Sequence, residues 1–168
     1  MRYNSQLSDS DILRGLKIIC IALPAGVVLF SVIAISIGSD GPSTMDPSSL
    51  IVLRVAHLII TIAAILAQKF IYERILSGKL SMKYGPQTLV GRYRIATIVK
   101  LALIEGSALF GLVLIVIAST GGFLKTDITM YLHLIPVLLL IGAAQSSYPS
   151  EQKIADLSRL YPDQQVVI

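Results

Sequence analysis

The stretch IATIVKLALIEGSALFGLVLIVIAS, residues 95–119, decides how the rest of the chain is interpreted. It is almost wholly apolar, and as a helix rising about 1.5 Å per residue it is long enough to cross a hydrocarbon core of about 30 Å. Its single carboxylate, Glu105, lies about ten residues, or roughly 15 Å, from the charged end at Arg92 and Arg94. The sequence therefore predicts a membrane-spanning helix with an acid near the bilayer midplane, where a carboxylate is costly and normally faces protein or water.

Small side chains surround this acid. Ala102 and Gly106 form one small-xxx-small pair, and Ser107 and Gly111 form a second. Such pairs let another helix approach closely, so we expect a packing face here. The full set of predicted helix-packing positions is Gly26, Phe30, Ala102, Gly106, Ser107, Phe110 and Gly111.

The composition places the whole chain in the membrane class. Of its 168 residues 54% are apolar and only 14% are charged, with a mean hydropathy of +0.76, whereas soluble domains carry about 25% charged residues. The one cysteine, Cys20, lies inside an apolar run, so no disulfide within the chain and no metal cluster is implied. The net charge of +4 does not indicate a nucleic-acid partner, because the basic residues are distributed by membrane topology.

Apolar runs predict an all-α membrane protein with one membrane domain, residues 1–168. The predicted spans are residues 16–38, 50–68, 95–119 and 128–147, followed by a short tail, 148–168, with its own capped helix. Ser8, Asp9 or Ser10 is expected to cap a separate interfacial helix before the first span. Arg14 and Lys17 before an apolar run also fit a signal peptide, but the run is longer than the roughly 7–15 residues of a secretory segment. Pro24 is expected to bend the first span.

The distribution of Lys and Arg predicts the orientation. The connection from Lys69 to Arg94 holds six of them and the tail two, with Arg2, Arg14 and Lys17 before or at the edge of the first span. The connections 39–49 and 120–127, on the opposite side of the membrane, together hold only Lys125. By the positive-inside rule both termini and the central connection face the cytoplasm, and we expect a bacterial inner membrane.

The chain resembles itself at a shift of 80 residues. Ten of 26 ungapped positions are identical between residues 14–39 and 94–119, including the pairs Gly26/Gly106 and Phe30/Phe110. The second and fourth spans match at a shift of 76, which aligns His57 with His133. The simplest interpretation is two parallel copies of a two-helix hairpin related by an axis along the membrane normal.

Polar residues in the second span form one stripe. Arg54, His57 and Thr61 follow the helical spacing of three or four residues. One hypothesis is a buried cluster of Glu105 with His57 or Arg54 that lines a proton path or holds the helices in register. The alternative is a protonated Glu105 that bonds Thr61 or a backbone carbonyl purely for packing.

The two histidines allow one remote cofactor hypothesis. His57 and His133 lie at similar depth on repeat-equivalent spans, as axial haem ligands do in four-helix cytochromes. We nevertheless expect no cofactor, no metal site and no enzyme. The sequence has no Gly-rich phosphate loop, no Ser/His/Asp set and no second carboxylate beside Glu105.

Two resemblances add to this. The segment from Leu103 to Val113, an acid followed by small residues and then Phe-Gly-Leu, resembles the carboxylate helix of rotary-ATPase proteolipid subunits. The Gly-xxx-Phe of the first span and the ALxEGxALF block at 102–110 resemble uncharacterised small four-helix bacterial inner-membrane proteins. That resemblance covers most of the chain and implies a setting but no activity.

The sequence therefore predicts a non-enzymatic membrane subunit in the lipid bilayer that packs with itself as a homo-oligomer or with a larger membrane complex. The rival hypothesis is a proton- or ion-translocating component that uses Glu105. A b-type haem anchor is the remote alternative.

Overall fold

The computed structural model describes residues 8–37, 46–79 and 88–161, except for the side chains of Pro47 and Lys125. Within these ranges the chain is mainly helical, with no strand. Predictions about Arg2, Lys83, the turn residues 38–45 and the tail beyond 161 lie outside the described residues.

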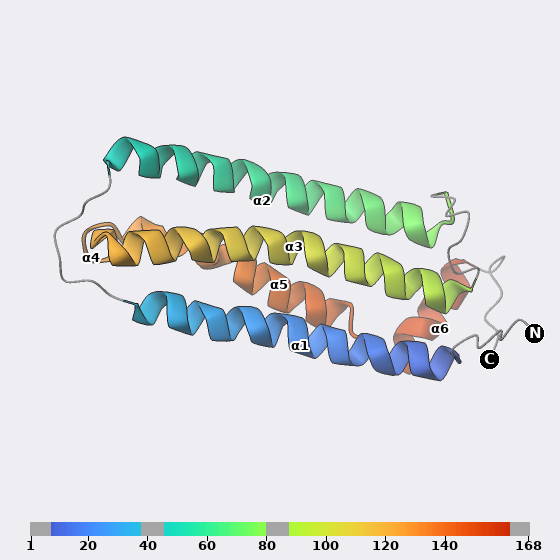
Figure 1. The fold of residues 1–168 in the computed structure, drawn as a ribbon. Helices are drawn as coiled ribbons and strands as arrows, with labels where there is room; N and C mark the ends of the chain where they lie inside the picture. Colours follow the sequence, from blue (N-terminus) through green and yellow to red (C-terminus); the bar gives the residue numbers. More distant parts are fainter. Residues whose placement is uncertain (1–7, 38–45, 80–87, 162–168) are drawn as a thin grey trace, which may run out of the picture.

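Four long helical segments run back and forth along one axis (Figure 1). They are α1 (Asp9–Ser36), α2 (Pro47–Leu76), α3 (Leu89–Thr120) and a fourth segment made of the 3₁₀ helix η1 (Ile128–Leu134) and α5 (Ile135–Ser146). The short α4 (Phe123–Thr126) joins α3 to η1, and α6 (Glu151–Leu160) follows α5. We refer to the two ends of the bundle as the α4 end and the α6 end.

All four segments are long and apolar enough to cross a membrane, which confirms the four predicted spans. The helices extend further than the spans, however. Ser8 caps α1 by accepting a hydrogen bond from the Asp11 amide, and the helix then continues to Ser36 past Pro24. The expected separate interfacial helix was therefore wrong, because nothing between Asp9 and Leu16 breaks the helical backbone. The predicted tail helix is confirmed as α6, capped by Ser150.

The fourth segment reaches across a bilayer despite having only 19 residues. A 3₁₀ helix rises about 2.0 Å per residue and an α-helix about 1.5 Å, so η1 and α5 together span roughly 32 Å. Pro136 lies in the first turn of α5, where a missing amide hydrogen costs nothing. The change from 3₁₀ to α-helix therefore falls at Ile135, where Pro136 fits into the first turn without losing a hydrogen bond.

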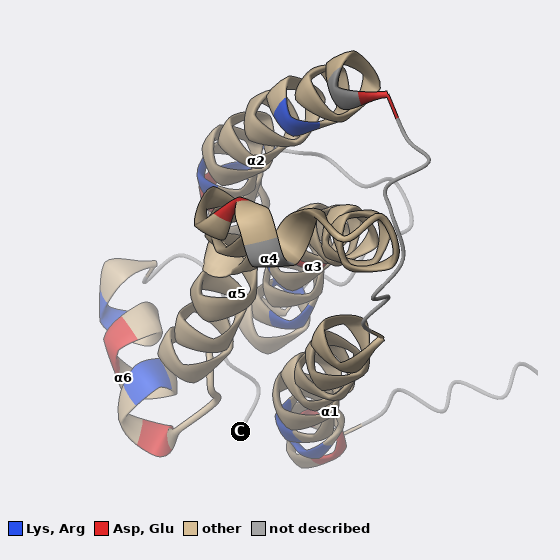
Figure 2. Cartoon of the chain, turned by 90° about the vertical axis from the view of Figure 1, so that its left-hand side faces the viewer, with Lys and Arg blue, Asp and Glu red and all other residues tan. Residues whose placement is uncertain are grey.

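The central element is α3. It packs against α1, α2, η1 and α5, and Figure 2 shows it between α2 and α1, with α5 on a third side. Of the 18 consecutive residues that form the most apolar part of α3, 50% are buried, whereas the corresponding shares are 22% for α1 and 17% for α2. The core between α1, α3 and α5 includes Leu16, Cys20, Val27, Leu101, Ala108, Leu112, Ile115 and Leu140.

The outward surfaces of α1 and α2 are apolar. Large side chains there are 38–68% exposed, among them Ile18, Leu29, Val32, Val52, Leu58, Ile59, Leu66 and Phe70. A surface of this kind in water would be a large apolar patch, whereas in lipid it is the expected outer surface of a bundle. The chain is therefore an α-helical protein built as an integral membrane protein.

The predicted duplication stays a prediction, and the two hairpins do not pack alike. In the second hairpin η1 and α5 lie directly against α3. In the first, α1 and α2 lie on different sides of α3 and share few or no contacts within the described residues (Figures 1 and 2). Any structural equivalence therefore holds for single helices rather than for whole hairpins.

Candidate functional site

A pair of histidines lies in the interior, between α2 and η1. The Nδ1 atoms of His57 and His133 are 2.7 Å apart, and both side chains are buried, with 4% and 8% of their surface exposed. The Nε2 atom of His57 lies 3.1 Å from the Ser107 carbonyl oxygen, which can only accept, so this nitrogen carries a hydrogen. A neutral His57 then accepts at Nδ1, and His133 donates. One hydrogen lies between the rings, so the pair holds at most one positive charge.

Hydroxyl groups continue this network toward the middle of the bundle. Thr61 Oγ1 lies 2.7 Å from Ser107 Oγ and 3.4 Å from His57 Nε2. Together His133, His57, Thr61 and Ser107 form what we call the histidine network. It links α2, α3 and η1 by hydrogen bonds, and three of its four side chains, those of His57, Ser107 and His133, are buried, where unpaired polar groups are costly.

Gly111 makes room for the pair. A Cβ atom built at this position would collide with the carbonyl oxygen of His133 and lie 2.8 Å from Nε2 of His57. Phe110 contacts the His57 ring edge-on, with the ring centroids 5.6 Å apart. The predicted Ser107-xxx-Gly111 face is therefore used inside the chain, where it receives α2 and η1.

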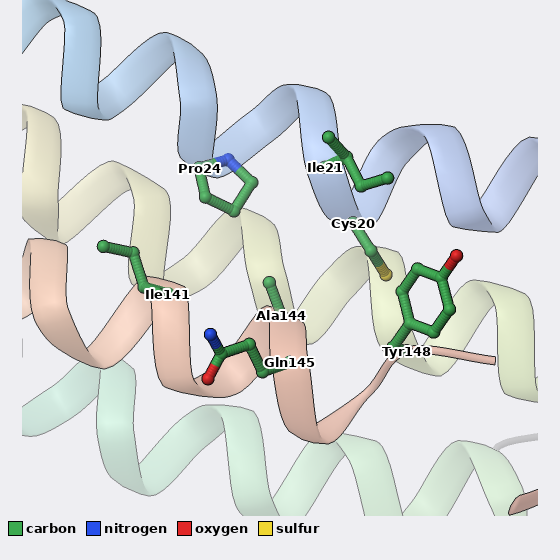
Figure 3. A pocket seen from close by; sticks show the side chains of 7 residues that line it. All are labelled: Cys20, Ile21, Pro24, Ile141, Ala144, Gln145 and Tyr148. Carbon is green, nitrogen blue, oxygen red and sulfur yellow. The ribbon is translucent and has the colours of Figure 1, made fainter. Parts of the chain in front are cut away.

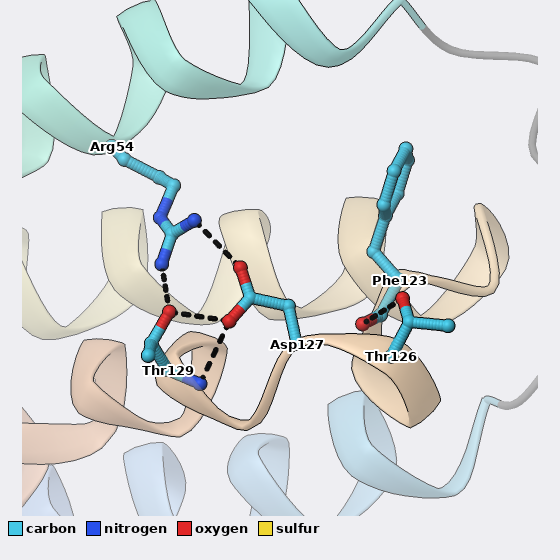
Figure 4. A network of polar contacts seen from close by, with 5 residues as sticks. All are labelled: Arg54, Phe123, Thr126, Asp127 and Thr129. Carbon is cyan, nitrogen blue, oxygen red and sulfur yellow. Dashed lines mark hydrogen bonds and ion pairs between the residues drawn. The ribbon is translucent and has the colours of Figure 1, made fainter.

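Arg54 contacts Asp127 and Thr129, where η1 begins, and not Glu105. Its Nη1 donates to Asp127 Oδ2 at 2.8 Å, and its Nη2 donates to Thr129 Oγ1 (Figure 4). Asp127 also caps η1 by accepting from the Thr129 amide at 2.9 Å. These hydrogen bonds, with the Thr129 side chain contributing most, hold the pKa of the Asp127 carboxyl below its ordinary value. Arg54 thus ties α2 to the start of the fourth segment at the α4 end.

The predicted cluster of Glu105 with His57 or Arg54 is not formed. Glu105 is partly exposed, and the described residues offer it no hydrogen bond or ion pair. The reason is rotation around α3: Glu105 precedes the inward-facing Ser107 by two residues, about 200° around a helix. The alternative bond to Thr61 is absent for the same reason, because Thr61 bonds Ser107.

Glu105 lies instead in a row of outward-facing residues. Ala102 and Gly106 are exposed, and Leu109 and Val113 are 38% and 44% exposed. We call these four residues and Glu105 the outer face of α3. A Cβ atom added to Gly106 would meet nothing within 4 Å. The two small-residue pairs of this helix therefore face different ways: Ser107 and Gly111 face into the chain, and Ala102 and Gly106 face outward.

The other predicted packing residues divide in the same way. Gly26 on α1 is exposed, and an added Cβ atom would again meet nothing within 4 Å. Phe30 is partly buried and packs against the core.

The histidine pair does not fit a haem. Axial ligation requires the iron to lie between the two imidazole nitrogens, whereas these rings hydrogen-bond each other directly through Nδ1. The remaining His57 nitrogen bonds the Ser107 carbonyl, and this side of the His57 ring lies close against Gly111. This arrangement therefore does not fit the remote haem hypothesis. Among the described residues, no group of three or more His, Cys, Asp or Glu could hold a metal ion.

A separate cavity of about 450 Å³ lies between α1 and the last turns of α5 (Figure 3). Its lining is mainly apolar and comprises Cys20, Ile21, Pro24, Ile141, Ala144, Gln145 and Tyr148. The Cys20 thiol is 3.7 Å from the Ser147 carbonyl oxygen, to which it donates. The phenol of Tyr93 donates to the same oxygen at 2.8 Å.

Sequence reasoning missed two functional neighbours. Asp127 stands in a turn and gave no signal beyond its charge, although its position before Thr129 is typical of a helix cap. Ser107 was assigned to packing alone, and its hydrogen bonds depend on which way α3 faces.

Comparisons of the chain with protein-family models, with curated proteins and with solved structures find no match.

Proposed function

We propose that this chain is a non-enzymatic membrane subunit that binds another transmembrane helix through the outer face of α3. The observation that carries the proposal is the exposure of Ala102 and Gly106 on the otherwise most buried helix. Small residues let two helix backbones approach closely, and close packing is a main source of helix association in lipid. Small residues such as Gly26 on α1 and Ala63 on α2 are exposed as well, but the pair on α3 lies beside the carboxylate of Glu105.

Glu105 supports the same proposal. The Nζ of Lys100 bonds Ser146, the last residue of the fourth span, which sets the level of the α6-end boundary. Glu105 is five residues, or about 7.5 Å, further along α3 than Lys100 and therefore lies inside the apolar layer. An unpaired carboxylate at this depth is costly in lipid and is stabilised by a partner that supplies a hydrogen-bond donor. A second copy of the chain or a larger complex would supply that partner.

The proposal also includes the membrane in which the chain lies and its orientation there. Most of the described Lys and Arg residues stand in the parts of α1, α2, α3 and α6 nearest the α6 end (Figure 1), so the positive-inside rule favours cytoplasmic termini in a bacterial inner membrane. The resemblance to small four-helix bacterial inner-membrane proteins supports the same assignment.

A matched pair of glycines tests the proposal. Gly106 on α3 and Gly142 on α5 are both exposed helical glycines whose added Cβ atoms meet nothing within 4 Å. We expect Gly106→Leu to reduce self-association, or co-purification of a partner in mild detergent, at least tenfold. Gly142→Leu should leave it unchanged. The measurement is light scattering of the purified protein with mass spectrometry of co-purifying chains. A monomer without partners in the wild type, or equal effects of both substitutions, would contradict the proposal.

Proton translocation is the second candidate function. The histidine network favours it, because it places exchangeable hydrogens between the α4 end and the middle of the bundle. Glu105→Gln and His57→Ala together separate the two functions, because Glu105 lies on the outer face of α3 and His57 lies in the histidine network. A subunit without transport keeps its assembly and changes no proton flux in vesicles, whereas a translocating component keeps assembly and loses flux. Carbodiimide labelling of Glu105 at neutral pH would favour translocation, since it requires a protonated, accessible carboxyl.

A further inference from the structure

Lys100 on α3 is a partly buried cation without an anion. Its Nζ donates to Ser147 Oγ at 2.9 Å and Ser146 Oγ at 3.3 Å, and it lies 5.5 Å from the centroid of the Tyr72 ring. Within the described ranges no carboxylate lies at ion-pair distance from it. An ammonium group has three N–H donors, and these contacts use two of them. One donor and the full positive charge are left for a ligand.

A second lysine increases the positive charge at this position. Lys153 lies in the first turn of α6, six residues after Ser147, to which Lys100 is bonded, and its charge acts on Lys100. The position of α6 is fixed by Leu157, which is buried against the core, and by the Ser150 cap. Two ammonium groups held near each other in a region of reduced dielectric repel each other. An anion bound between them is attracted to both and offsets this repulsion.

The level of the two lysines in the bundle indicates the source of the anion. Ser146 ends the fourth span, so the Lys100 ammonium group, which bonds it, lies where the apolar layer meets the headgroup layer. This is the end that carries most of the basic side chains. Anionic phospholipids supply phosphate groups at this level, and basic pockets between helix ends bind such headgroups.

We propose that Lys100 and Lys153 bind the phosphate group of an anionic phospholipid at the junction of α3, α5 and α6. Lys100 donates its remaining N–H to a phosphate oxygen, and Lys153 neutralises the charge from the α6 side. The seryl hydroxyls of Ser146 and Ser147 hold the Lys100 ammonium in place. This site is separate from the outer face of α3 and does not depend on the function proposed for that face.

The test compares lipids on the purified full chain in detergent. We expect phosphatidylglycerol to raise the unfolding temperature and to remain bound in native mass spectrometry, whereas phosphatidylcholine does neither. Lys100→Gln and Lys153→Gln should each lower the apparent affinity for phosphatidylglycerol at least fivefold. Lys69→Gln is the control, since Lys69 is an exposed lysine near the same end of the bundle.

Comparison of the three variants, the two lipids and inorganic phosphate shows whether the proposal holds. The Lys153 substitution lies on the short α6, so it keeps the test valid if Lys100→Gln does not fold. Equal losses in all three variants would overturn the proposal, because they would indicate diffuse attraction to basic residues. Equal binding of both lipids would also overturn it. Protection by inorganic phosphate alone at the concentration effective for the lipid would overturn the assignment to a lipid and give the site to a soluble phosphate.

Discussion

The Nδ1 atoms of His57 and His133 lie 2.7 Å apart although the residues are 76 positions apart in the sequence. The contact joins the second span to the fourth across a buried interface. A single hydrogen serves both rings, which makes the two residues energetically dependent on each other. This dependence can be measured.

His57→Ala, His133→Ala and the double substitution should give non-additive losses of stability. Hydrogen bonds between membrane helices contribute about 0.6 kcal/mol on average and up to about 1.7 kcal/mol, so we expect a coupling energy of about 1 kcal/mol. The measurement is the free energy of unfolding of each variant in mixed detergent micelles. Additivity within about 0.3 kcal/mol would show that the contact contributes nothing of its own.

Gly111→Ala should destabilise the protein, while Gly106→Ala should not. At position 111 the new methyl group would collide with the His133 carbonyl and the His57 ring, and overpacking of this kind costs about 1–3 kcal/mol. At position 106 nothing lies within 4 Å, and replacing a helical glycine gains up to about 1 kcal/mol. Thermal unfolding of the two variants measures the difference. Equal unfolding temperatures would mean that the histidine pair does not lie against Gly111.

The contact between Arg54 and Asp127 should stabilise the protein at neutral pH and fail in acid. The carboxyl of Asp127 has a pKa below its ordinary value of 3.8, chiefly because Thr129 donates to it. Its contribution is therefore fully present above the unfolded-state pKa and is lost as the pH falls through the lower folded-state pKa. We expect the difference in unfolding temperature between wild type and Asp127→Asn to be constant from about pH 8 to 5 and to shrink below about pH 4.

Thr129→Ala is the control for this effect. It removes the hydroxyl group whose hydrogen bond contributes most to the lowered pKa of Asp127, and it leaves the carboxyl and Arg54 in place. The acid transition should therefore move toward the ordinary pKa of an aspartate. An unchanged pH profile in both variants would assign the acid sensitivity of the protein to other groups.

Cysteine labelling should place the α6 end in the cytoplasm. In a Cys20→Ser background, Gln152→Cys on α6 and Ser49→Cys on α2 put exposed thiols at opposite ends of the bundle. We expect a membrane-impermeant maleimide to label position 49 in intact spheroplasts and position 152 only in inverted vesicles. The reverse pattern would refute the orientation that the basic residues predict, and the background protein without either cysteine controls for non-specific labelling.

The number, length and type of the spans follow from the sequence alone. Burying a backbone in lipid requires about 20 apolar residues in a helix, and this requirement is local, so runs such as residues 95–119 reveal it directly. The caps at Ser8 and Ser150 are equally local, because a side chain bonds an amide three residues away.

The tertiary structure alone decided which side of each helix meets which partner. Glu105 and Ser107 are two residues apart, yet one faces outward and the other bonds Thr61 and His57. The rotation of α3 is set by packing against α1, α2, η1 and α5 together, and apolar side chains cover most of its circumference, so its sequence carries no clear inward stripe. For this reason the sequence located the acid and both histidines within their spans, whereas only the packed bundle paired the histidines and left the acid on the outside.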